Sequence, residues 1–498
     1  MDNLLTLWRV SADACPSAWI GDEAGWIPYA EFVHEVDRLA AGLAEHGIRP
    51  FDRVAVHSAK TVPTAAALLA VSQLRAIAVP LGANLKGRHR DHILTETDAK
   101  LLLADVADPD VLGTGDWSGA IRPIGEVRGV GHAPDTAPLA TDPAVIFYTS
   151  GSTGWPKGVV ASHANLLAGI DSMRTVVAPA PDDVVLCLLP LSFDAGFNQL
   201  LTALAAGSDI RLAEFRFARS TVAACAEAGV TSLTAVPPLW RKLLDAPWPE
   251  AARTCMRCCA TTGGQVTADL DARLRDTFPA ARQLRMYGFT EAFRGASLPD
   301  SAAATQGAIG QPIPGAELLV VDDAGDVCPP GRVGEIVQTG PLVTQGYWGR
   351  PEATAAAFVT LARNGWRMRA ARSGDLGYQT ADGGFVVVGR RDEQIKTSGY
   401  RVSPSEIEDT ARESGLVTEA VAFGEPDPVL GERIVLAVTA ARPPLDPATL
   451  TRYLRDSVPA HLVPATIVEM TAMPALANGK IDRTSVRARA RELVETQA

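Results

Sequence analysis

The sequence has little lysine, a deficit of positive charge and no long apolar run. Only seven lysines stand beside 39 arginines, and the net charge at pH 7 is −11. Proteins that bind nucleic acid use clustered Lys and Arg, so nucleic acid is not an expected partner. The longest apolar stretch, residues 65–81, is interrupted by Gln73 and Arg75, so no membrane span is expected. The N-terminal residues show no basic segment followed by an apolar one, so we expect no secretory signal and a cytoplasmic protein.

Cysteine is also sparse, and its spacing does not suit a metal site. The segment CMRCC of residues 255–259 contains three of the seven cysteines and resembles a CxxC motif. No second Cys or His pair lies at metal-ligand spacing. The small residues ATTGG that follow are typical of a strand end, so buried thiols in a reducing compartment are expected here rather than zinc.

Two stretches of the chain alternate between helical and strand patterns. Residues 29–81 give helix, strand, helix and strand in turn, and residues 183–287 repeat this order with short apolar strands. Such alternation is typical of mostly parallel sheets joined by right-handed helical crossovers. The sequence therefore predicts an α/β fold with two sheets of the parallel type.

The pattern changes in the last third of the chain. From Gly315, short strands separated by turns predict a small β-barrel, and the last hundred or so residues predict a compact α+β domain. Ser403, with Glu406 three residues later, predicts a helix that starts with a capping box. A chain of 498 residues is too long for one hydrophobic core. We expect a large N-terminal domain, residues 1–391, and a mobile C-terminal domain, residues 392–498.

A polar, glycine-rich loop, TSGSTGWPKG of residues 149–158, follows an apolar strand of residues 144–148. Its exposed backbone N–H groups suit an anion such as phosphate. A Walker A loop would have Gly before its Lys and Ser or Thr after it, whereas Pro156 and Gly158 stand there. A flexible linker has a similar composition but needs neither the Pro-Lys step nor a strand leading in. We therefore predict a phosphate-binding loop that is not a P-loop.

The segment YTSGSTGWPKGVV resembles the signature loop of the adenylate-forming superfamily, which contains acyl-CoA synthetases, adenylation domains of nonribosomal peptide synthetases, and luciferases. Further segments resemble the other motifs of that superfamily in its order and spacing, and together they cover nearly the whole chain: MYGFTEA (286–292), IGQPIPGAE (309–317), GEIVQTGPLVTQGYWGRPEAT (334–354), SGDLG (373–377), GRRDEQIKTSGYRVSPSEIE (389–408) and NGKIDR (478–483).

The resemblance implies a two-step reaction. A carboxylic acid attacks the α-phosphate of ATP to give acyl-AMP and pyrophosphate, and the acyl group then passes to a thiol of CoA or of carrier-protein pantetheine. Two alternatives stay open: an amide bond synthetase that transfers the acyl group to a free amine, and an inactive relative that only binds ligands. Only 18 residues follow Lys480, so a carrier protein would be a separate chain.

The ATP site is assigned from the resemblance residue by residue. The glycine-rich loop would close over the β- and γ-phosphates, Tyr287 would line the adenine slot, and Asp375 with support from Arg390 would bind the ribose hydroxyls. The implied ATP-binding set is Thr149, Ser150, Gly151, Ser152, Thr153, Gly154, Lys157, Gly263, Gly264, Gln265, Tyr287, Asp375 and Arg390.

The resemblance also implies the catalytic groups and the moving parts. Lys480 would bridge the substrate carboxylate and the α-phosphate, Thr290 would contact phosphate, and Glu291 would bind Mg²⁺, a hard cation that prefers carboxylate and phosphate oxygen. Asp392 would be the hinge of the C-terminal domain. Gly399 would then line the channel for pantetheine, because it has no side chain to block it.

The acid-binding pocket is where the resemblance leaves most open. In amino-acid-activating domains an Asp at the position of Asp194 binds the substrate amino group, but Gly196 replaces the Ser of their FDxS pattern. Asp194 either binds substrate or caps the following helix. Arg294 either pairs with Asp194, binds a second anionic group of the substrate, or points to solvent. Amino, aryl and aliphatic acids all remain open; the expected pocket residues are Phe193, Asp194, Asn198, Ala235, Thr262, Met286 and Arg294.

Overall fold

The computed structural model describes residues 4–497 except residues 84, 86, 105–116, 132, 135, 150–155, 300–306, 364, 392, 394, 398–399, 428–429, 459 and 477–478. The chain divides into two compact units. The first comprises Met1–Ala303, Ile309–Leu318 and Gln338–Ala371, and the second comprises Ala304–Ala308, Leu319–Val337 and Arg372–Ala498. Asp392, the predicted hinge, lies outside the described residues, so the hinge and the boundary beside it stay predictions.

The first sheet of the first unit has the strand order β18-β8-β7-β4-β3-β5-β6. Strands β7, β4, β3, β5 and β6 pair in parallel, whereas β8 and β18 are antiparallel additions at one edge. Parallel strands are covered by helices on both faces, which is why β4 is buried at every residue. The strands are β3 (Arg53–His57), β4 (Ile77–Leu81), β5 (Leu101–Ala104), β6 (Ala120–Arg122), β7 (Pro143–Thr149), β8 (Lys157–Ser162) and β18 (Gly346–Tyr347).

The second sheet contains the run β2-β1-β10-β9-β11-β12-β13-β14-β15. Its strands are parallel from β1 to β13, and β2, β14 and β15 are antiparallel. The prediction of two mostly parallel sheets is confirmed. The strands are β1 (Trp19–Asp22), β2 (Gly25–Pro28), β9 (Val184–Cys187), β10 (Asp209–Leu212), β11 (Ser232–Ala235), β12 (Cys258–Thr262), β13 (Arg282–Tyr287), β14 (Ala296–Pro299) and β15 (Ala308–Pro312).

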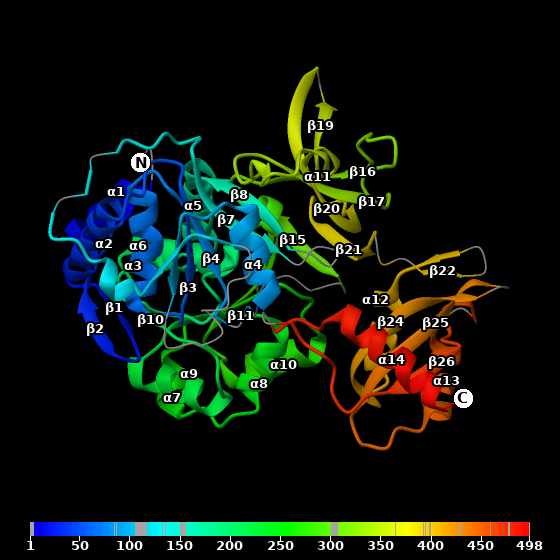
Figure 1. Cartoon of the computed structure of the whole chain (residues 1–498). Coiled ribbons are helices and arrows are strands. Elements are labelled where there is room, and N and C mark those ends of the chain that lie inside the picture. Colours follow the sequence, from blue (N-terminus) through cyan, green and yellow to red (C-terminus); the bar gives the residue numbers. More distant parts are fainter. Residues whose placement is uncertain are drawn as a thin grey trace. The chain divides into compact units, whose positions relative to one another are not determined.

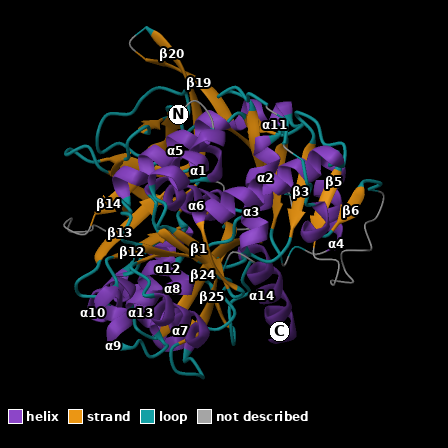
Figure 2. Cartoon of the chain, turned by 90° about the vertical axis from the view of Figure 1, so that its left-hand side faces the viewer, coloured by secondary structure: helices purple, strands orange, loops and turns teal. Residues whose placement is uncertain are grey.

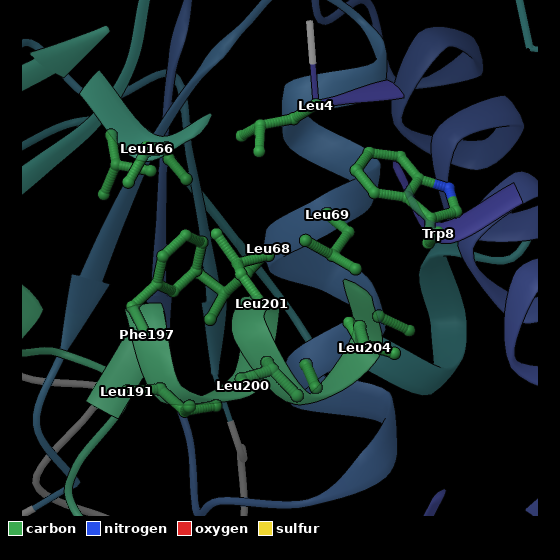
Figure 3. Packing of buried hydrophobic residues seen from close by; sticks show 14 of the residues in the cluster. Leu4, Trp8, Leu68, Leu69, Leu166, Leu191, Phe197, Leu200, Leu201 and Leu204 are labelled. Atoms are coloured by element: carbon green, nitrogen blue, oxygen red, sulfur yellow. The ribbon is translucent and has the colours of Figure 1, made fainter. Parts of the chain in front are cut away.

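The main hydrophobic core of the first unit joins residues of both sheets through the helices α1 (Leu5–Ala14), α3 (Val62–Gln73), α5 (His163–Val176) and α6 (Asp194–Ala206). Figure 3 shows Phe197 and Leu201 of α6 next to Leu68 and Leu69 of α3, with Leu4 and Trp8 of the N-terminal segment in the same cluster. Burying one such Leu or Phe side chain contributes about 1.5–3 kcal/mol. This packing fixes α6, and therefore Asp194 at its first turn, against the sheets.

Four further helices lie close in the fold, and all but the shortest contribute residues to a second core against the strands β9, β11 and β12. The helices α7 (Ala218–Ala228), α8 (Pro237–Leu244), α9 (Glu250–Cys255) and α10 (Ala268–Thr277) lie together in both views (Figures 1 and 2). Trp240 and Phe278 are fully buried there and meet edge to face. Cys258 and Cys259 of β12 are buried, and burial raises the pKa of both thiols. These cysteines are core residues, as the sequence predicted.

The strands β16, β17, β20 and β21 lie partly or wholly in the second unit, which also contains an α+β region. The strand order β16-β17-β20-β21 uses β16 (Glu317–Val321), β17 (Gly334–Thr339), β20 (Trp366–Gln379) and β21 (Phe385–Arg390), and β19 (Phe358–Arg363) pairs with β20. A further sheet has the order β23-β22-β25-β24, with β26 beside β25. Its elements are β22 (Ile395–Thr397), β23 (Tyr400–Val402), α12 (Pro404–Glu413), β24 (Val417–Asp427), β25 (Gly431–Ala440), α13 (Pro447–Ser457), β26 (Thr466–Glu469) and α14 (Arg483–Gln497).

The α+β region buries both faces of its sheet. Alternate residues of β24 and β25 belong to two clusters, one packed with α12 and α13 and the other with α14, as the period of two in a strand requires. Figure 1 shows these helices and strands together at the C-terminal end of the chain. The predicted α+β region is confirmed, and none of the described helices is both long enough and apolar enough to cross a bilayer.

The start of α12 differs from the prediction in one respect. Ser403 is the N-cap residue, but its side chain makes no capping bond, so the predicted capping box is wrong. The Ser403 hydroxyl instead donates to the carbonyl of Val388 at 2.8 Å. A Cβ at Gly389 would lie 2.2 Å from the Ser403 hydroxyl oxygen, so β21 approaches Ser403 closely. The carbonyl of Val388 in β21 therefore takes the hydroxyl proton, and the hydroxyl does not cap the helix.

Candidate active site

Several predicted site residues lie at the carboxyl ends of neighbouring parallel strands. Ala235 ends β11, Thr262 ends β12, and Met286 and Tyr287 end β13. Ala235 is paired with Thr261, and Thr262 with Met286, so these ends form one edge of the sheet. In open α/β sheets this edge is where ligands bind. The register therefore assembles residues that are distant in the sequence.

Asp194 opens α6, in the connection that follows β9, and it makes two contacts. The hydroxyl of Thr290 donates to Asp194 Oδ1 at 3.0 Å, and Arg294 Nη1 lies 3.5 Å from Asp194 Oδ2. The N-cap residue of α6 is Phe193 and no side chain caps the helix, so the interpretation of Asp194 as a cap is wrong. Because the only hydroxyl proton of Thr290 is used by Asp194, a phosphate contact by Thr290 requires this bond to be released.

Arg294 is a buried cation. Its side chain is 11% exposed, which excludes the expectation that it points to solvent. Burial lowers the pKa of Arg294, and the charge of Asp194 partly opposes this effect. The Arg294 carbonyl accepts a bond from Gln338 Nε2 at 3.0 Å, which holds its backbone in place. An arginine stays protonated in proteins, so this part of the site carries a permanent positive charge.

A cavity of about 30 Å³ lies beside Arg294. Three of the predicted pocket residues line it, namely Asn198, Met286 and Arg294, whereas Phe193, Asp194, Ala235 and Thr262 do not. The expected set of seven pocket residues did not include the remaining lining residues: Met173, Val177, Pro179, Val185, Ala195, Gln199, Thr202, Ala203, Ser232 and Thr234. The helical period starting at Asn198 could have found Ala195 and Thr202, which share its face of α6.

Packing explains why Gly196 replaces the Ser of the FDxS pattern. A Cβ at this position would lie 2.2 Å from the carbonyl oxygen of Pro190 and 2.7 Å from that of Leu189. Both atoms belong to backbone, which cannot swing aside as a flexible side chain can. The first turn of α6 therefore approaches the preceding segment too closely for Ser, so Gly196 reports on packing rather than directly on the substrate.

Glu291 is held beside the phosphate-loop hairpin by Tyr347. The Tyr347 hydroxyl donates to Glu291 Oε1 at 2.6 Å, and Lys157 Nζ lies 5.4 Å from the centre of the Tyr347 ring. Thr344 donates to the Glu291 carbonyl from its amide at 2.9 Å and from its hydroxyl at 2.8 Å. Burial raises the pKa of Tyr347, and the negative charge of Glu291 raises it further. The tyrosine therefore stays protonated and remains a donor.

The base of the predicted phosphate loop is a strand hairpin. Thr149, at the end of β7, is paired with Lys157, the first residue of β8, which confirms the strand predicted before the loop. Arg350 Nη2 donates to the carbonyl of Pro156 at 3.1 Å, and it also pairs with Glu96 at 2.5 Å. Residues 150–154, five members of the predicted set, lie outside the described residues. Arg350 and Glu96 were not predicted, because they lie far from the loop in the sequence.

The predicted adenine and ribose residues take up defined positions in their own units. Gly263, with a φ of +76°, begins the turn that continues through Gly264 and Gln265 after β12. In the second unit, Arg390 Nη1 donates to Asp375 Oδ1 at 3.0 Å, and the two residues are paired across β20 and β21. Asp375 therefore lies within a strand, next to a bulge, and not in a glycine turn.

Lys480 lies in the second unit, directly after Gly479. Its carbonyl accepts a bond from the amide of Leu476 at 2.7 Å, and Gly479 has a φ of +80°. The Lys480 side chain is exposed. Gly399, predicted for the thiol channel, lies outside the described residues, as does Asp392.

Two family models match the chain. The model described as AMP-binding enzyme matches residues 9–348, and the model described as AMP-binding enzyme C-terminal domain matches residues 406–480. The chain belongs to the AMP-binding enzyme family. It is an adenylate-forming ligase, and the likeness that the motifs of residues 149–158 and 286–292 indicated is confirmed.

Relatives of this ligase include acyl-CoA synthetases and peptide synthetases. A feruloyl-CoA synthase from a Streptomyces species is 31% identical and covers 93% of this chain and 94% of its own length. A probable nonribosomal peptide synthetase of Salinispora arenicola is 33% identical over 96% of this chain, but the chain spans only 6% of that protein. The ATP-bound structure of MatB from Rhodopseudomonas palustris has a TM-score of 0.87 at 25% identity and covers 99% of each chain.

Proposed function

We propose that this ligase activates a carboxylic acid with ATP and transfers the acyl group to a thiol, supplied by CoA or by pantetheine on a separate carrier protein. The observation that carries the proposal is the contact of Tyr347 with both Glu291 and Lys157. The Tyr347 side chain therefore contacts both a carboxylate suited to Mg²⁺ and the hairpin at the base of the predicted phosphate loop. A site for a nucleotide triphosphate needs these two groups together.

Donors at this site have to offset the repulsion between two anions. Attack of a carboxylate on the α-phosphate brings like charges together, and fixed donors lower the barrier by stabilising the charge that develops. Lys157 supplies a cation at the base of the loop. Thr290, released from Asp194, supplies a hydroxyl donor next to Glu291.

Glu291 fits the role of a magnesium ligand. Among the described residues only Tyr347 hydrogen-bonds its carboxylate, and only through Oε1. The other oxygen suits a cation that takes few protein carboxylates and several phosphate oxygens. When bound, Mg²⁺ would neutralise phosphate charge, while Tyr347 and Thr344 keep Glu291 in one orientation.

Two further residues of the proposed set act on the nucleotide and the acid. Asp375, fixed by Arg390, accepts hydrogen bonds from ribose hydroxyls. Lys480 donates to the substrate carboxylate and the α-phosphate during activation, as its motif in the family indicates. A thiol acceptor is supported by the intact segment KTSGYR of residues 396–401 and by the feruloyl-CoA synthase likeness.

The test is pyrophosphate release with a panel of acids, first with ATP and Mg²⁺ alone and then with CoA, a pantetheinylated carrier or an amine. We expect acid-dependent release and a stable thioester with one of the thiols. A stable amide in place of a thioester would assign the amide synthetase alternative. No release with any acid would overturn the proposal and favour a protein that only binds ligands.

A further inference from the structure

The cavity beside Arg294 contains hydrogen-bonding groups that the protein itself leaves without partners. An arginine side chain carries several N–H donors in a planar fork. Within the described chain Arg294 makes one side-chain hydrogen bond, from Nη1 to Asp194, and its 3.5 Å length is long for a charged pair. Arg294 Nε is buried without a partner. A buried donor without a partner lowers the free energy of unfolding by about 1–3 kcal/mol, and by more when it is charged.

A second unmet donor lines the same cavity. Asn198 is buried, and its Nδ2 has no hydrogen-bond partner in the described structure, while its Oδ1 accepts from Thr202 at 3.4 Å. Gln199 donates to the carbonyl of Leu186 at 3.2 Å and leaves Oε1 as an unpartnered acceptor. The other lining residues are mostly apolar. The cation and the amide donor therefore add two unsatisfied polar groups to a mostly apolar lining.

The carboxylate of Asp194 does not fully neutralise the charge of Arg294. One of its oxygens accepts from Thr290 at 3.0 Å, and the residue opens α6, where the helix N-terminus already favours a negative charge. A substrate ammonium group at Asp194 would also lie close to the Arg294 cation, so an α-amino acid suits this site poorly. An oxygen anion next to Arg294 would be attracted by the cation and would satisfy its donors.

We infer that the acid substrate is a short dicarboxylic acid whose second carboxylate is bound by Arg294 inside the cavity, with Asn198 as a further donor. This inference rests on the proposed function, because it names the class of acid that is activated. A space of about 30 Å³ has room for a short polar terminus in the present side-chain arrangement. One carboxylate reacts with ATP near Thr290, and the other stays ionised at Arg294.

The first experiment compares matched acids on the wild-type enzyme. Dicarboxylic acids of three to six carbons are each measured against the half-amide of the same length, which is isosteric but neutral at the far end, and against the simple monocarboxylic acid. We expect kcat/KM for pyrophosphate release to be about 10- to 100-fold higher for the best diacid than for its half-amide, as loss of a charged hydrogen bond predicts. Equal or better use of the half-amide or monoacid would overturn the inference.

The second experiment uses Arg294→Gln, which keeps a donor but removes the charge. We expect the diacid to lose about 10- to 100-fold in kcat/KM and the half-amide to be unaffected or improved. Arg285→Gln is the matched control, because Arg285 of β13 pairs with Asp271 at 2.5 Å and does not line the cavity. The control should retain the diacid preference.

The outcomes separate the two proposals. An equal loss of kcat/KM for all acids in Arg294→Gln, together with a lower melting temperature, would make Arg294 a structural residue and overturn the inference. In that case acid-dependent pyrophosphate release by the wild type would still support the proposed function. Absence of release from every acid in the wild type would instead remove the proposed function. Calorimetric titration of the wild type and Arg294→Gln with the preferred diacid adds a readout without turnover, in which binding should weaken about 10- to 100-fold.

Discussion

Replacing Tyr347 by Phe tests whether the Tyr347 hydroxyl positions Glu291 for magnesium. The substitution removes the 2.6 Å bond to Glu291 Oε1 and keeps the ring that Lys157 and Phe358 contact. A hydrogen bond to a charged acceptor contributes about 1.5–3 kcal/mol. Loss of a group that orients a metal ligand typically weakens metal binding by about 10- to 100-fold. Because burial and Glu291 both raise the pKa of Tyr347, its ionisation does not complicate the comparison near neutral pH.

The assay is acid-dependent pyrophosphate release at fixed ATP over a wide range of Mg²⁺. We expect the Mg²⁺ concentration for half-maximal rate to rise by about 10- to 100-fold in Tyr347→Phe and the rate to recover at high Mg²⁺. Tyr453→Phe on α13 serves as a matched control and should leave the Mg²⁺ dependence unchanged. An unaltered Mg²⁺ midpoint in Tyr347→Phe, whatever happens to the melting temperature, would refute the assignment of Glu291 as a metal ligand positioned by this tyrosine.

Three further predictions concern catalysis and stability. Lys480→Ala should lower the adenylation rate by at least about 10²–10³-fold and leave the melting temperature unchanged, since the side chain is exposed; an active variant would contradict its role. His163 is buried, and burial lowers its pKa to about 4, opposed by the charge of Asp142 and aided by that of Arg75. Its contribution to stability is therefore retained above pH 6.5 and falls by about 3 kcal/mol as the pH drops to 4. His163→Gln should flatten that acid limb in urea unfolding, and a slope like the wild type would disprove the assignment. Gly196→Ser should lower the free energy of unfolding by about 1–3 kcal/mol, because its Cβ would meet the carbonyl of Pro190; a neutral effect would refute the packing explanation.

Local patterns predicted much of the fold. The apolar runs and helical periods gave both parallel sheets, the α+β region, and the strand before the phosphate loop, because burial imposes a period on each element that does not depend on its partners. The wrong predictions concern polar side chains that can bond to more than one partner. Ser403 bonds to Val388 instead of capping α12, and Asp194 turns to Thr290 instead of capping α6.

The order and spacing of its motifs, from residue 149 to residue 483, determined by themselves that this chain is an adenylate-forming ligase. The tertiary structure decided which distant groups meet. Asp194 and Arg294 are separated by 100 positions, and Glu291 and Tyr347 by 56, yet strand order and register bring each pair into contact. Hydrophobic periodicity reports which face of an element is buried, but it carries no information about which remote polar groups share that buried space.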